Sequence, residues 1–534
     1  MPQLWIDDRP VEVAPGATLL DAARLAGIDV PTLCYLDGCQ ASTSCQVCIV
    51  KLVDLNRFVP SCGMPAEEGL RVESETAEVH HLRRTALELL LSDHVGDCLA
   101  PCYFACPAHM DVPQMLREIG DQDLQAAIAT IKQDIALPAV LGRVCSKPCE
   151  KGCRRKTADG PVEVCELKRY VADRDLARGE PYVPACQPDT GKGVAVVGAG
   201  PAGLAAAFHL RLNGHRVALF EARNQLGGRL RRDFPEQLPV ATLDAEINAL
   251  LLTGIDVHAP TSLGSELSLD KLRRQYDAVL LAVGAEAGQQ AAGWGLETAR
   301  RGIATEAGTF QTGLPGVFAA GCAVRGTAMV VRSVADGKEA AAAIHSFLLG
   351  KPITPVTRPF SSRIGKLEHH ELEEFLALAD SRPPLDQPPA ANDPLSLPIV
   401  SQQADRCLGC GCVSHGNCRL ERYAIQYGAQ PQRFQDGRRA FVQVNRHGSV
   451  IYEPGKCINC ELCIQIAARA QDALGLSFVG RGFDVRIGVP FNHTFEEALG
   501  SVAAQCIDAC PTGALYLSPL HQRKLARTAA PEDP

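Results

Sequence analysis

The chain has 534 residues, of which 46% are hydrophobic and 23 are cysteines, and its formal net charge at pH 7 is -8. This length predicts several domains, and the mildly acidic, mixed charge pattern argues against nucleic acid as a main partner. The chain starts without a signal-peptide pattern, and no apolar run approaches the ~18 residues of a membrane-spanning helix. We therefore expect a cytoplasmic protein without direct membrane insertion, in which disulfide bonds would not account for the cysteines.

Residues 1–77 start with two expected short strands, around Leu4–Ile6 and Val11–Val13, and a helix at Thr18–Ala26. Cysteines then follow at the spacing C-x10-C-x2-C-x13-C: Cys34, Cys45, Cys48 and Cys62. Four thiolates suit a 2Fe–2S cluster, although zinc also binds four cysteines. The phrase IDVPTLCY at Ile28–Tyr35 resembles the plant-type ferredoxin domain of the large iron–sulfur subunit of complex I, of formate dehydrogenases and of iron-only hydrogenases. The resemblance implies a 2Fe–2S ferredoxin with a β-grasp fold.

Residues 78–190 combine an expected leucine-rich helix at Leu82–Leu91 with further cysteines. In the complex I relatives a similar helix leads to a histidine and three cysteines that bind one 4Fe–4S cluster, but here the spacing departs from that family. From Cys102 onward, the patterns C-x3-C-P, GRVC-x3-C-x3-C and GPV resemble the N-terminal helical domain of the glutamate synthase small subunit, which dihydropyrimidine dehydrogenase also carries. That domain holds two 4Fe–4S clusters with interleaved ligands.

The resemblance implies two ligand sets in this segment: Cys98, Cys102 and Cys153 with His94 for one cluster, and Cys106, Cys145 and Cys149 for the other. In the relatives the second cluster takes its fourth ligand from a Gln or Glu after the Gly-Pro. Counting from Gly160, that place holds Lys168, which cannot bind iron while it is protonated. Cys165 lies one helical turn earlier on the same face, so we expect it to be the ligand, with Glu166 as the alternative.

Residues 191–352 carry a pattern that is typical of nucleotide binding. Val194–Gly203 reads VAVVGAGPAG, and the acid Glu221 follows a second apolar strand. The glycines let the backbone approach a pyrophosphate at a helix N-terminus, and the acid can bind a ribose. Together with Gly227–Leu230 and Gly316–Gly321, the pattern resembles the FAD domain of the glutamate synthase small subunit and other two-dinucleotide flavoproteins.

This resemblance implies that FAD is bound by Gly198, Gly200, Pro201, Ala202, Gly203, Glu221, Gly228, Arg229, Gly321 and Cys322. Cys322 stands where the relatives have an Asp that hydrogen-bonds the flavin, and a thiol is a weak donor. Only thirty-odd residues separate Val279–Ala285 from Gly316–Gly321, with no second glycine fingerprint. A nucleotide-binding βαβ unit alone needs about 30 residues, so we expect the NADPH domain of the family to be missing. A helix at Val331–Leu348 should cap the flavin.

Residues 353–400 are expected to be a Pro-rich linker, which a short helix at Leu367–Leu378 interrupts. Residues 401–450 place four cysteines within twelve residues: Cys407, Cys410, Cys412 and Cys418. Such a cluster predicts a metal site, either 4Fe–4S or structural zinc.

Residues 451–518 resemble the two halves of a bacterial-type ferredoxin. Such folds bind two clusters, each of which borrows its fourth cysteine from the other motif. Here Ala467 occupies the place of the last cysteine of the first motif, so Cys506 is expected to be a remnant of the second cluster. One 4Fe–4S cluster is implied, on Cys457, Cys460, Cys463 and Cys510. A polar tail, residues 519–534, should follow.

The sequence therefore predicts a multidomain protein with α/β and α+β parts: a β-grasp 2Fe–2S ferredoxin, a helical double-cluster domain, a Rossmann-like FAD domain and a bacterial ferredoxin-like domain. Clusters carry single electrons, whereas FAD exchanges one or two. We expect an oxidoreductase acting as an electron-transfer subunit of a hetero-oligomeric complex, whose catalytic partner is a formate dehydrogenase, a hydrogenase or a similar subunit. A soluble electron carrier is a further expected partner. The alternatives are a self-sufficient NAD(P)H:acceptor or electron-bifurcating oxidoreductase, and a non-enzymatic redox sensor or scaffold.

Overall fold

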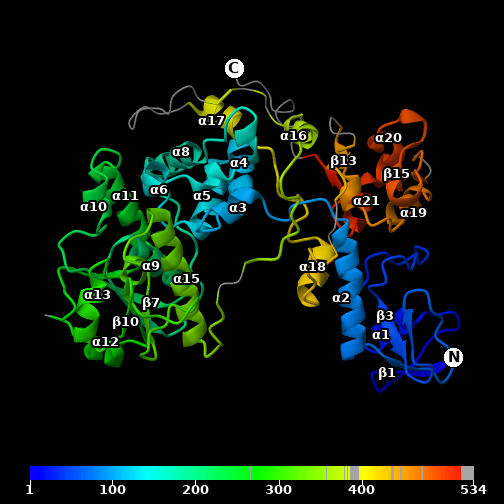
Figure 1. Cartoon of the computed structure of the whole chain (residues 1–534), viewed down its shortest axis with the longest axis horizontal. Coiled ribbons are helices and arrows are strands. Elements are labelled where there is room, and N and C mark those ends of the chain that lie inside the picture. Colours follow the sequence, from blue (N-terminus) through cyan, green and yellow to red (C-terminus); the bar gives the residue numbers. More distant parts are fainter. Residues whose placement is uncertain are drawn as a thin grey trace. The chain divides into compact units, whose positions relative to one another are not determined.

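The computed structural model describes the chain except residues 265, 356–357, 378, 380, 382, 385–395, 435–437, 445–447, 471–472 and 519–534. The chain divides into two compact units, each built from separate stretches of sequence. Unit 1 comprises Met1–Ala100, Phe360–Leu378 and Gly409–Pro534, and unit 2 comprises Pro101–Pro359 and Ala379–Leu408. Figure 1 labels the elements along the chain. The expected tail and the middle of the expected linker lie outside the described residues.

Unit 1 begins with a mixed five-stranded sheet in the order β2-β1-β5-β3-β4. Its strands are β1 (Gln3–Ile6), β2 (Arg9–Glu12), β3 (Ile49–Leu52), β4 (Arg57–Pro60) and β5 (Arg71–Glu73). β1 pairs with β5 in parallel, and the other pairs are antiparallel. Helix α1 (Leu19–Leu25) starts at a capping box, in which Thr18 and Asp21 satisfy each other's backbone N–H groups. Buried leucines of α1 pack on the sheet.

The sheet is followed by α2 (Ala77–Ser92), a longer helix than the leucine pattern alone indicated. Arg83 is fully buried on α2 and donates to the Ile49 carbonyl of β3 and to the Tyr427 hydroxyl at 2.9 Å. α18 (Arg419–Gln426) lies beside α2 (Figure 1). The guanidinium of Arg83 therefore ties α2 to the sheet and to the end of α18.

The rest of unit 1 consists of short elements: α16 (His369–Leu376), β13 (Val450–Tyr452), α19 (Leu462–Ala467), β14 (Ser477–Val479), β15 (Arg486–Gly488), α20 (Phe495–Leu499), α21 (Ala503–Ala509) and β16 (Leu515–Leu517). β13 pairs with β16 and β14 with β15, both antiparallel. Glu371 of α16 accepts hydrogen bonds from the Arg438 guanidinium and from the Phe441 N–H at 2.7 Å. These contacts, with the Arg438 hydrogen bond foremost, lower the pKa of Glu371 to about 2.

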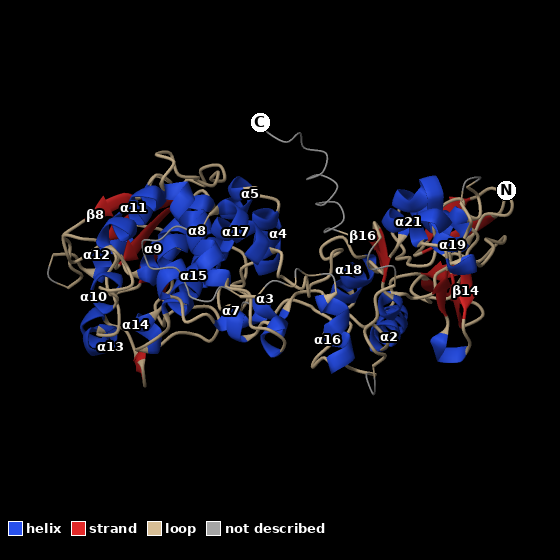
Figure 2. Cartoon of the chain, turned by 90° about the horizontal axis from the view of Figure 1, so that it is seen from above, coloured by secondary structure: helices blue, strands red, loops and turns tan. Residues whose placement is uncertain are grey.

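Unit 2 starts with a helical part: α3 (Pro101–Ala105), α4 (Val112–Gly120), α5 (Leu124–Asp134), α6 (Pro138–Val144), α7 (Pro148–Lys151) and α8 (Val164–Leu176), with α17 (Leu397–Ala404) added from later in the chain. Four of them, α4, α5, α8 and α17, lie close together in Figure 2. The start of α6 is capped from a distance, because the buried Glu246 carboxylate accepts the N–H groups of Ala139 and Val140 at 2.5 and 2.7 Å. α17 begins inside the segment expected as a linker.

The second part of unit 2 is a five-stranded parallel sheet in the order β12-β9-β6-β7-β8. Its strands are β6 (Gly193–Val197), β7 (Arg216–Phe220), β8 (Asp256–His258), β9 (Ala278–Leu281) and β12 (Val317–Ala319). The helices are α9 (Pro201–Leu212), α10 (Leu230–Asp233), α11 (Val240–Leu251), α12 (Leu269–Gln275), α13 (Ala287–Gln290), α14 (Cys322–Arg325) and α15 (Val330–Leu348). α15 packs closely on α9 at Gly337. A Cβ at this position would lie 2.2 Å from the Ala202 carbonyl oxygen, so the close approach requires a glycine.

Between β9 and β12 the chain forms α13, a short 3-10 turn and the two-residue strands β10 (Thr298–Ala299) and β11 (Gly302–Ile303). The described residues 282–316 contain no second parallel sheet. None of the helices that the structure describes has both the length and the apolar character that crossing a bilayer requires.

Candidate functional site

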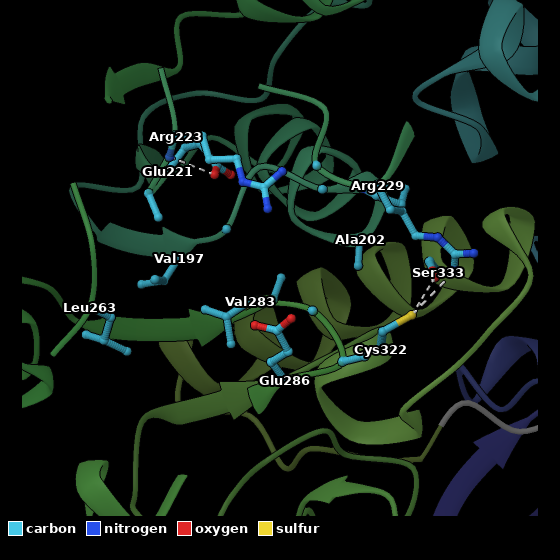
Figure 3. Close-up of a pocket in the computed structure, with 18 of the residues that line it drawn as sticks. Val197, Ala202, Glu221, Arg223, Arg229, Leu263, Val283, Glu286, Cys322 and Ser333 are labelled. Atoms are coloured by element: carbon cyan, nitrogen blue, oxygen red, sulfur yellow. Dashed lines mark hydrogen bonds between the residues drawn. The ribbon is translucent and has the colours of Figure 1, made fainter. Parts of the chain in front are cut away.

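Unit 2 contains a cavity of about 490 Å³ at the carboxyl ends of β6, β7 and β9 (Figure 3). In open parallel sheets this is where nucleotides bind. Residues predicted from the sequence line it: Gly198, Gly200, Pro201, Ala202, Glu221, Gly228, Arg229 and Cys322. Gly203 and Gly321 are not among the lining residues but shape the loop. A Cβ on Gly203 would lie 1.8 Å from the Gly198 oxygen, and one on Gly321, where φ is +67°, 2.6 Å from Ala202 Cβ.

Glu221 lies at the end of β7, where hydrogen bonds to the backbone hold its carboxylate. Oε2 accepts the Ala199 N–H of the glycine loop at 2.8 Å, and Oε1 accepts the Arg223 N–H at 3.1 Å (Figure 3). The acid therefore stands beside the start of α9, as a ribose-binding acid does in nucleotide sites of this kind.

Cys322 lies between two polar side chains at the other end of the cavity (Figure 3). Its Sγ accepts a weak hydrogen bond from Arg229 Nη1 at 3.8 Å and lies 3.9 Å from Ser333 Oγ. Arg229 Nη1 also donates to the Ala328 carbonyl at 2.9 Å.

Sequence reasoning missed several residues that line this cavity: Arg223, Arg232, Glu286, Trp294 and Ser333. Ser333 comes from α15, the helix expected to cap a flavin. Arg223 follows Glu221 by two positions and supplies positive charge that could have been anticipated for a phosphate-binding cavity. The others carry no local pattern that marks them.

Four thiols of unit 2 lie near the ammonium of Lys168: those of Cys106, Cys145, Cys149 and Cys165. Lys168 is buried on α8, one turn from Cys165. Burial alone would lower the pKa of Lys168, but the nearby thiols raise it above its usual value. A buried ammonium is costly unless negative charge lies beside it. Iron-bound thiolates would supply that charge, so these residues fit a 4Fe–4S cluster.

Cys165 is held in place by its backbone, and its thiol interacts with two of the three other thiols. Its N–H donates to the Glu150 carboxylate at 2.9 Å, and its Sγ interacts with those of Cys145 and Cys149. Glu166, the alternative ligand, instead faces the cations Lys147 and Arg169, at 3.5 and 3.2 Å.

In unit 1, the thiols of the first group are all buried: Cys34, Cys45, Cys48 and Cys62. The Sγ atoms of Cys48 and Cys62 are 3.4 Å apart, and Cys34 interacts with both Cys45 and Cys62. The loop that brings the first three together includes Thr43 and Gln46 in left-handed conformations. This convergence fits a cluster rather than scattered thiols.

The second group of unit 1 lines a small cavity of about 20 Å³: Cys457, Cys460, Cys463, Cys506 and Cys510. Cys506 is fully buried on α21, and its Sγ lies 3.7 Å from the Cys463 carbonyl oxygen. Ala467 is buried on α19, where a further ligand would be needed for a second cluster.

The four closely spaced cysteines of residues 407–418 do not stay in one unit. Cys407 belongs to unit 2, whereas Cys410, Cys412 and Cys418 belong to unit 1. Cys407 packs on the same core of unit 2 as Cys102 and Cys153.

Cys98 belongs to unit 1 and lies beside Cys412 and Cys418. The Cys412 N–H donates to the Cys98 carbonyl at 3.2 Å. The pKa of Cys98 is raised to about 12, mainly by burial and then by the charges of Glu421, Cys412 and Cys418.

His94 lies four residues before Cys98 in the sequence. Burial, together with the Lys456 charge, lowers the pKa of His94 to about 3, so its ring is neutral near pH 7. Its Nδ1 is buried without a hydrogen-bond partner in the described part of the chain. Neutral imidazole is the form that binds metals. Among the described residues, no group of three or more His, Cys, Asp or Glu side chains is arranged to hold a single metal ion.

Three family models match the chain. Residues 3–77 match a 2Fe–2S iron–sulfur cluster binding domain, residues 92–180 match dihydropyrimidine dehydrogenase domain II with its 4Fe–4S cluster, and residues 164–337 match a pyridine nucleotide-disulphide oxidoreductase domain. These matches confirm the resemblances expected for the first three segments. The chain thus carries 2Fe–2S and 4Fe–4S cluster-binding domains and an FAD-type oxidoreductase domain.

Curated relatives match parts of the chain. The beta subunit of NADP(+)-dependent formate dehydrogenase of Moorella thermoacetica is 38% identical over 240 residues, 41% of this chain and 32% of the relative. The beta subunit of NADPH-Fe(3+) oxidoreductase of Geobacter sulfurreducens is 37% identical over 189 residues, 35% of this chain and 28% of the relative. Subunit PreT of the NAD-dependent dihydropyrimidine dehydrogenase of Escherichia coli is 38% identical over 208 residues, 38% of this chain and 50% of the relative. The matches therefore span half or less of these relatives.

Proposed function

We propose that the chain is an iron–sulfur and FAD electron-transfer subunit of a hetero-oligomeric oxidoreductase complex. It passes electrons between a partner catalytic subunit, of the formate dehydrogenase or hydrogenase type, and another acceptor such as a soluble electron carrier. Two of the relatives named above are beta subunits of redox enzymes, which supports this role. We place the complex in the cytoplasm.

The observation that carries the proposal is that the cysteine groups of unit 1 adjoin one another. Cys34 and Cys460, from the first and second groups, belong to one buried cluster of side chains. Cys418 Sγ lies 3.6 Å from the carbonyl oxygen of Pro511, which follows Cys510 directly. A relay needs adjacent sites of this kind, because each cluster takes up and releases single electrons.

FAD would supply a centre that exchanges one or two electrons. The N–H groups at the start of α9, behind Gly200, would hold its pyrophosphate, and Glu221 would accept from a ribose hydroxyl. Arg223 and Arg229 add positive charge for the phosphate oxygens. We further propose a β-grasp fold for residues 1–77 and a ferredoxin-like fold for residues 451–518.

The proposal is tested by isolating the native complex under anaerobic conditions and identifying its subunits by mass spectrometry, with iron, zinc and flavin counts on the same sample. We expect a catalytic redox subunit to co-purify, with several clusters and about one FAD per chain. A stable, catalytically active monomer with its own substrate would overturn the proposal.

A second candidate is a self-sufficient NAD(P)H:acceptor or electron-bifurcating oxidoreductase. The match of residues 164–337 to a pyridine nucleotide-disulphide oxidoreductase model favours it. Stopped-flow mixing of the purified chain with NADPH or NADH separates the two candidates. Rapid bleaching of the flavin by either nucleotide supports the second candidate. If neither nucleotide bleaches the flavin, the result supports the electron-transfer subunit.

A further inference from the structure

We propose that His94, Cys98, Cys412 and Cys418 are the four ligands of one 4Fe–4S cluster inside unit 1. The proposal rests on the cluster-binding role given above. It assigns a ligand set that the spacing along the chain does not suggest, because residues 99–411 separate its two halves. It also removes Cys98 from the cluster expected for the dihydropyrimidine dehydrogenase-like segment.

The two halves run side by side as paired backbone. Asp97 and Gly411 form a parallel β-bridge. The hydrogen bond from the Cys412 N–H to the Cys98 carbonyl continues this pairing at 3.2 Å. A Cβ on Gly411 would lie 3.3 Å from the Ala100 nitrogen, so the segments are already in van der Waals contact. The backbone thus holds Cys98 and Cys412 as neighbours.

Cys418 brings a third thiol to the same place from the start of α18. It lies close enough to Cys98 for the two thiols to interact electrostatically. Cys418 is the N-cap residue of α18, and its Sγ accepts the Glu421 N–H at 3.4 Å. The N-terminus of a helix stabilises negative charge, which suits a thiolate that is bound to iron.

Lys456 supplies a buried cation beside these thiols. Its Nζ lies 3.7 Å from Cys412 Sγ. The chain makes room for it, because a Cβ on Gly96 would lie 2.7 Å from Lys456 Cε. An ammonium held in this position needs anionic partners, as iron-bound thiolates would be.

His94 completes the set. The N–H of Val95 donates to the Gly455 carbonyl at 2.7 Å, which fixes the His94 segment against the one that carries Lys456. The buried Nδ1 of His94 has no hydrogen-bond partner in the described part of the chain, and burying such an atom without a partner costs free energy. Coordination of iron by the ring would remove that cost.

Three of the predicted cysteine ligands in unit 2 belong neither to this ligand set nor to the four thiols near Lys168. Cys102, Cys153 and Cys407 pack on one core there. Cys407 lies in a different unit from Cys412 and Cys418, although only a few residues separate them in the sequence. On this assignment, the four closely spaced cysteines of residues 407–418 do not share one metal site.

The test uses the full-length protein, purified anaerobically with its FAD, and four single variants: Cys98→Ser, Cys412→Ser, Cys418→Ser and Cys407→Ser. Iron per FAD and EPR spectra of the reduced protein are measured. We expect the first three variants to lose the same EPR signal and about four irons each. Cys407→Ser should keep that signal and lose a different one. Cys186→Ser, at an exposed cysteine, is the matched control.

The opposite pattern overturns the assignment. If Cys407→Ser and Cys412→Ser lose one signal together while Cys98→Ser keeps it, the site is the contiguous one at residues 407–418. FAD content and circular dichroism identify variants that fail to fold, and the alanine variant at the same position then replaces the serine variant. A wild-type protein that contains zinc and no iron would instead refute the proposed function itself, so the two failures are distinguishable.

His94 is tested separately by His94→Cys and His94→Ala. If His94 is a ligand, His94→Cys keeps the iron but changes the g-values and lowers the potential of this one cluster, because a thiolate replaces a neutral ring. His94→Ala should weaken the same signal. Unchanged g-values and potential in both variants would remove His94 from the set.

Discussion

The two units balance buried charge in different ways. In unit 2, Lys168 lies near four thiols. The Glu246 carboxylate accepts two backbone N–H groups of α6, and Lys132 and Arg143 are its charged neighbours without an ion pair to it. In unit 1, Lys456 faces thiols but also forms an ion pair with Glu453, and Glu371 is paired with Arg438. In unit 2 the positive charge of Lys168 thus acts on the proposed cluster without a paired carboxylate. In unit 1 the Glu453 carboxylate neutralises much of the positive charge of Lys456. The surroundings of two otherwise similar clusters can therefore set them to different potentials.

The largest effect is expected from Lys168→Met, which keeps the length of the side chain and removes its charge. A nearby cation favours the reduced cluster, and one unit charge a few Å away contributes about 3 kcal/mol at an effective dielectric constant of about 20. The midpoint potential of the unit 2 cluster should fall by on the order of 100 mV. EPR-monitored redox titration measures this shift. Lys151→Met, at an exposed lysine of the same helical part, should leave the potential unchanged.

Glu246→Gln should remove a pH dependence of the free energy of unfolding of unit 2. Burial raises the pKa of Glu246 from 4.5 to about 7, so the folded protein holds this proton more tightly than the unfolded chain. The free energy of unfolding of unit 2 should therefore fall as pH rises from about 4.5 to about 7, by at most about 3 kcal/mol. Denaturation followed by the fluorescence of Trp294, in a Trp5→Phe background, reports on unit 2. A wild-type curve without this slope would contradict the expected charge imbalance.

Lys456→Met should have a smaller effect than Lys168→Met, because the carboxylate of Glu453 already offsets its charge. We expect the cluster beside Cys412 to fall in potential by less than half as much. Glu453→Gln alone should raise the potential, and the double variant should return close to the wild-type value. If Lys456→Met and Lys168→Met shift their clusters equally, the comparison between the units fails.

The smallest effect near neutral pH is expected from Glu371→Gln. The hydrogen bonds from Arg438 lower the pKa of Glu371 to about 2, so the folded state favours the ionised form. Its contribution to stability is present above pH 4.5 and is lost as pH falls toward 2, the opposite sign to Glu246. The fluorescence of Trp5, in a Trp294→Phe background, should show this loss in unit 1. Glu371→Gln should abolish it.

Most residues that the glycine pattern singled out line the cavity of unit 2. Strand, glycine loop, helix and acid lie within one short stretch, so the spacing from Gly198 to Glu221 already determines their geometry. The helical period likewise placed Cys165 one turn from Lys168, where the structure has it. Both features depend on residues that are close in sequence, and periodicity describes such residues directly.

Long-range placement was not predictable in the same way. Cys407 lies in unit 2 and Cys412 in unit 1, where Cys412 contacts Cys98. Both facts depend on where the chain returns to unit 1 after several hundred residues. No local spacing encodes that return. Ser333 was missed for a related reason, since it reaches the cavity only because α15 packs on α9.

The bridge between Asp97 and Gly411 has a consequence for how such a protein can be assembled from parts. The chain leaves unit 1 after Ala100, contributes Phe360–Leu378 to it, and returns to it again at Gly409. A Cβ on Gly411 would lie only 3.3 Å from the Ala100 nitrogen. Domains whose ends lie together can be inserted into a host loop without disturbing its fold. Most of unit 2 therefore has the character of a module inserted into unit 1, with the insertion point between residues that would bind one cluster. A gene fusion that restores unit 1 alone would join codons 1–100 to codons 409–518 and would also have to supply residues 360–378.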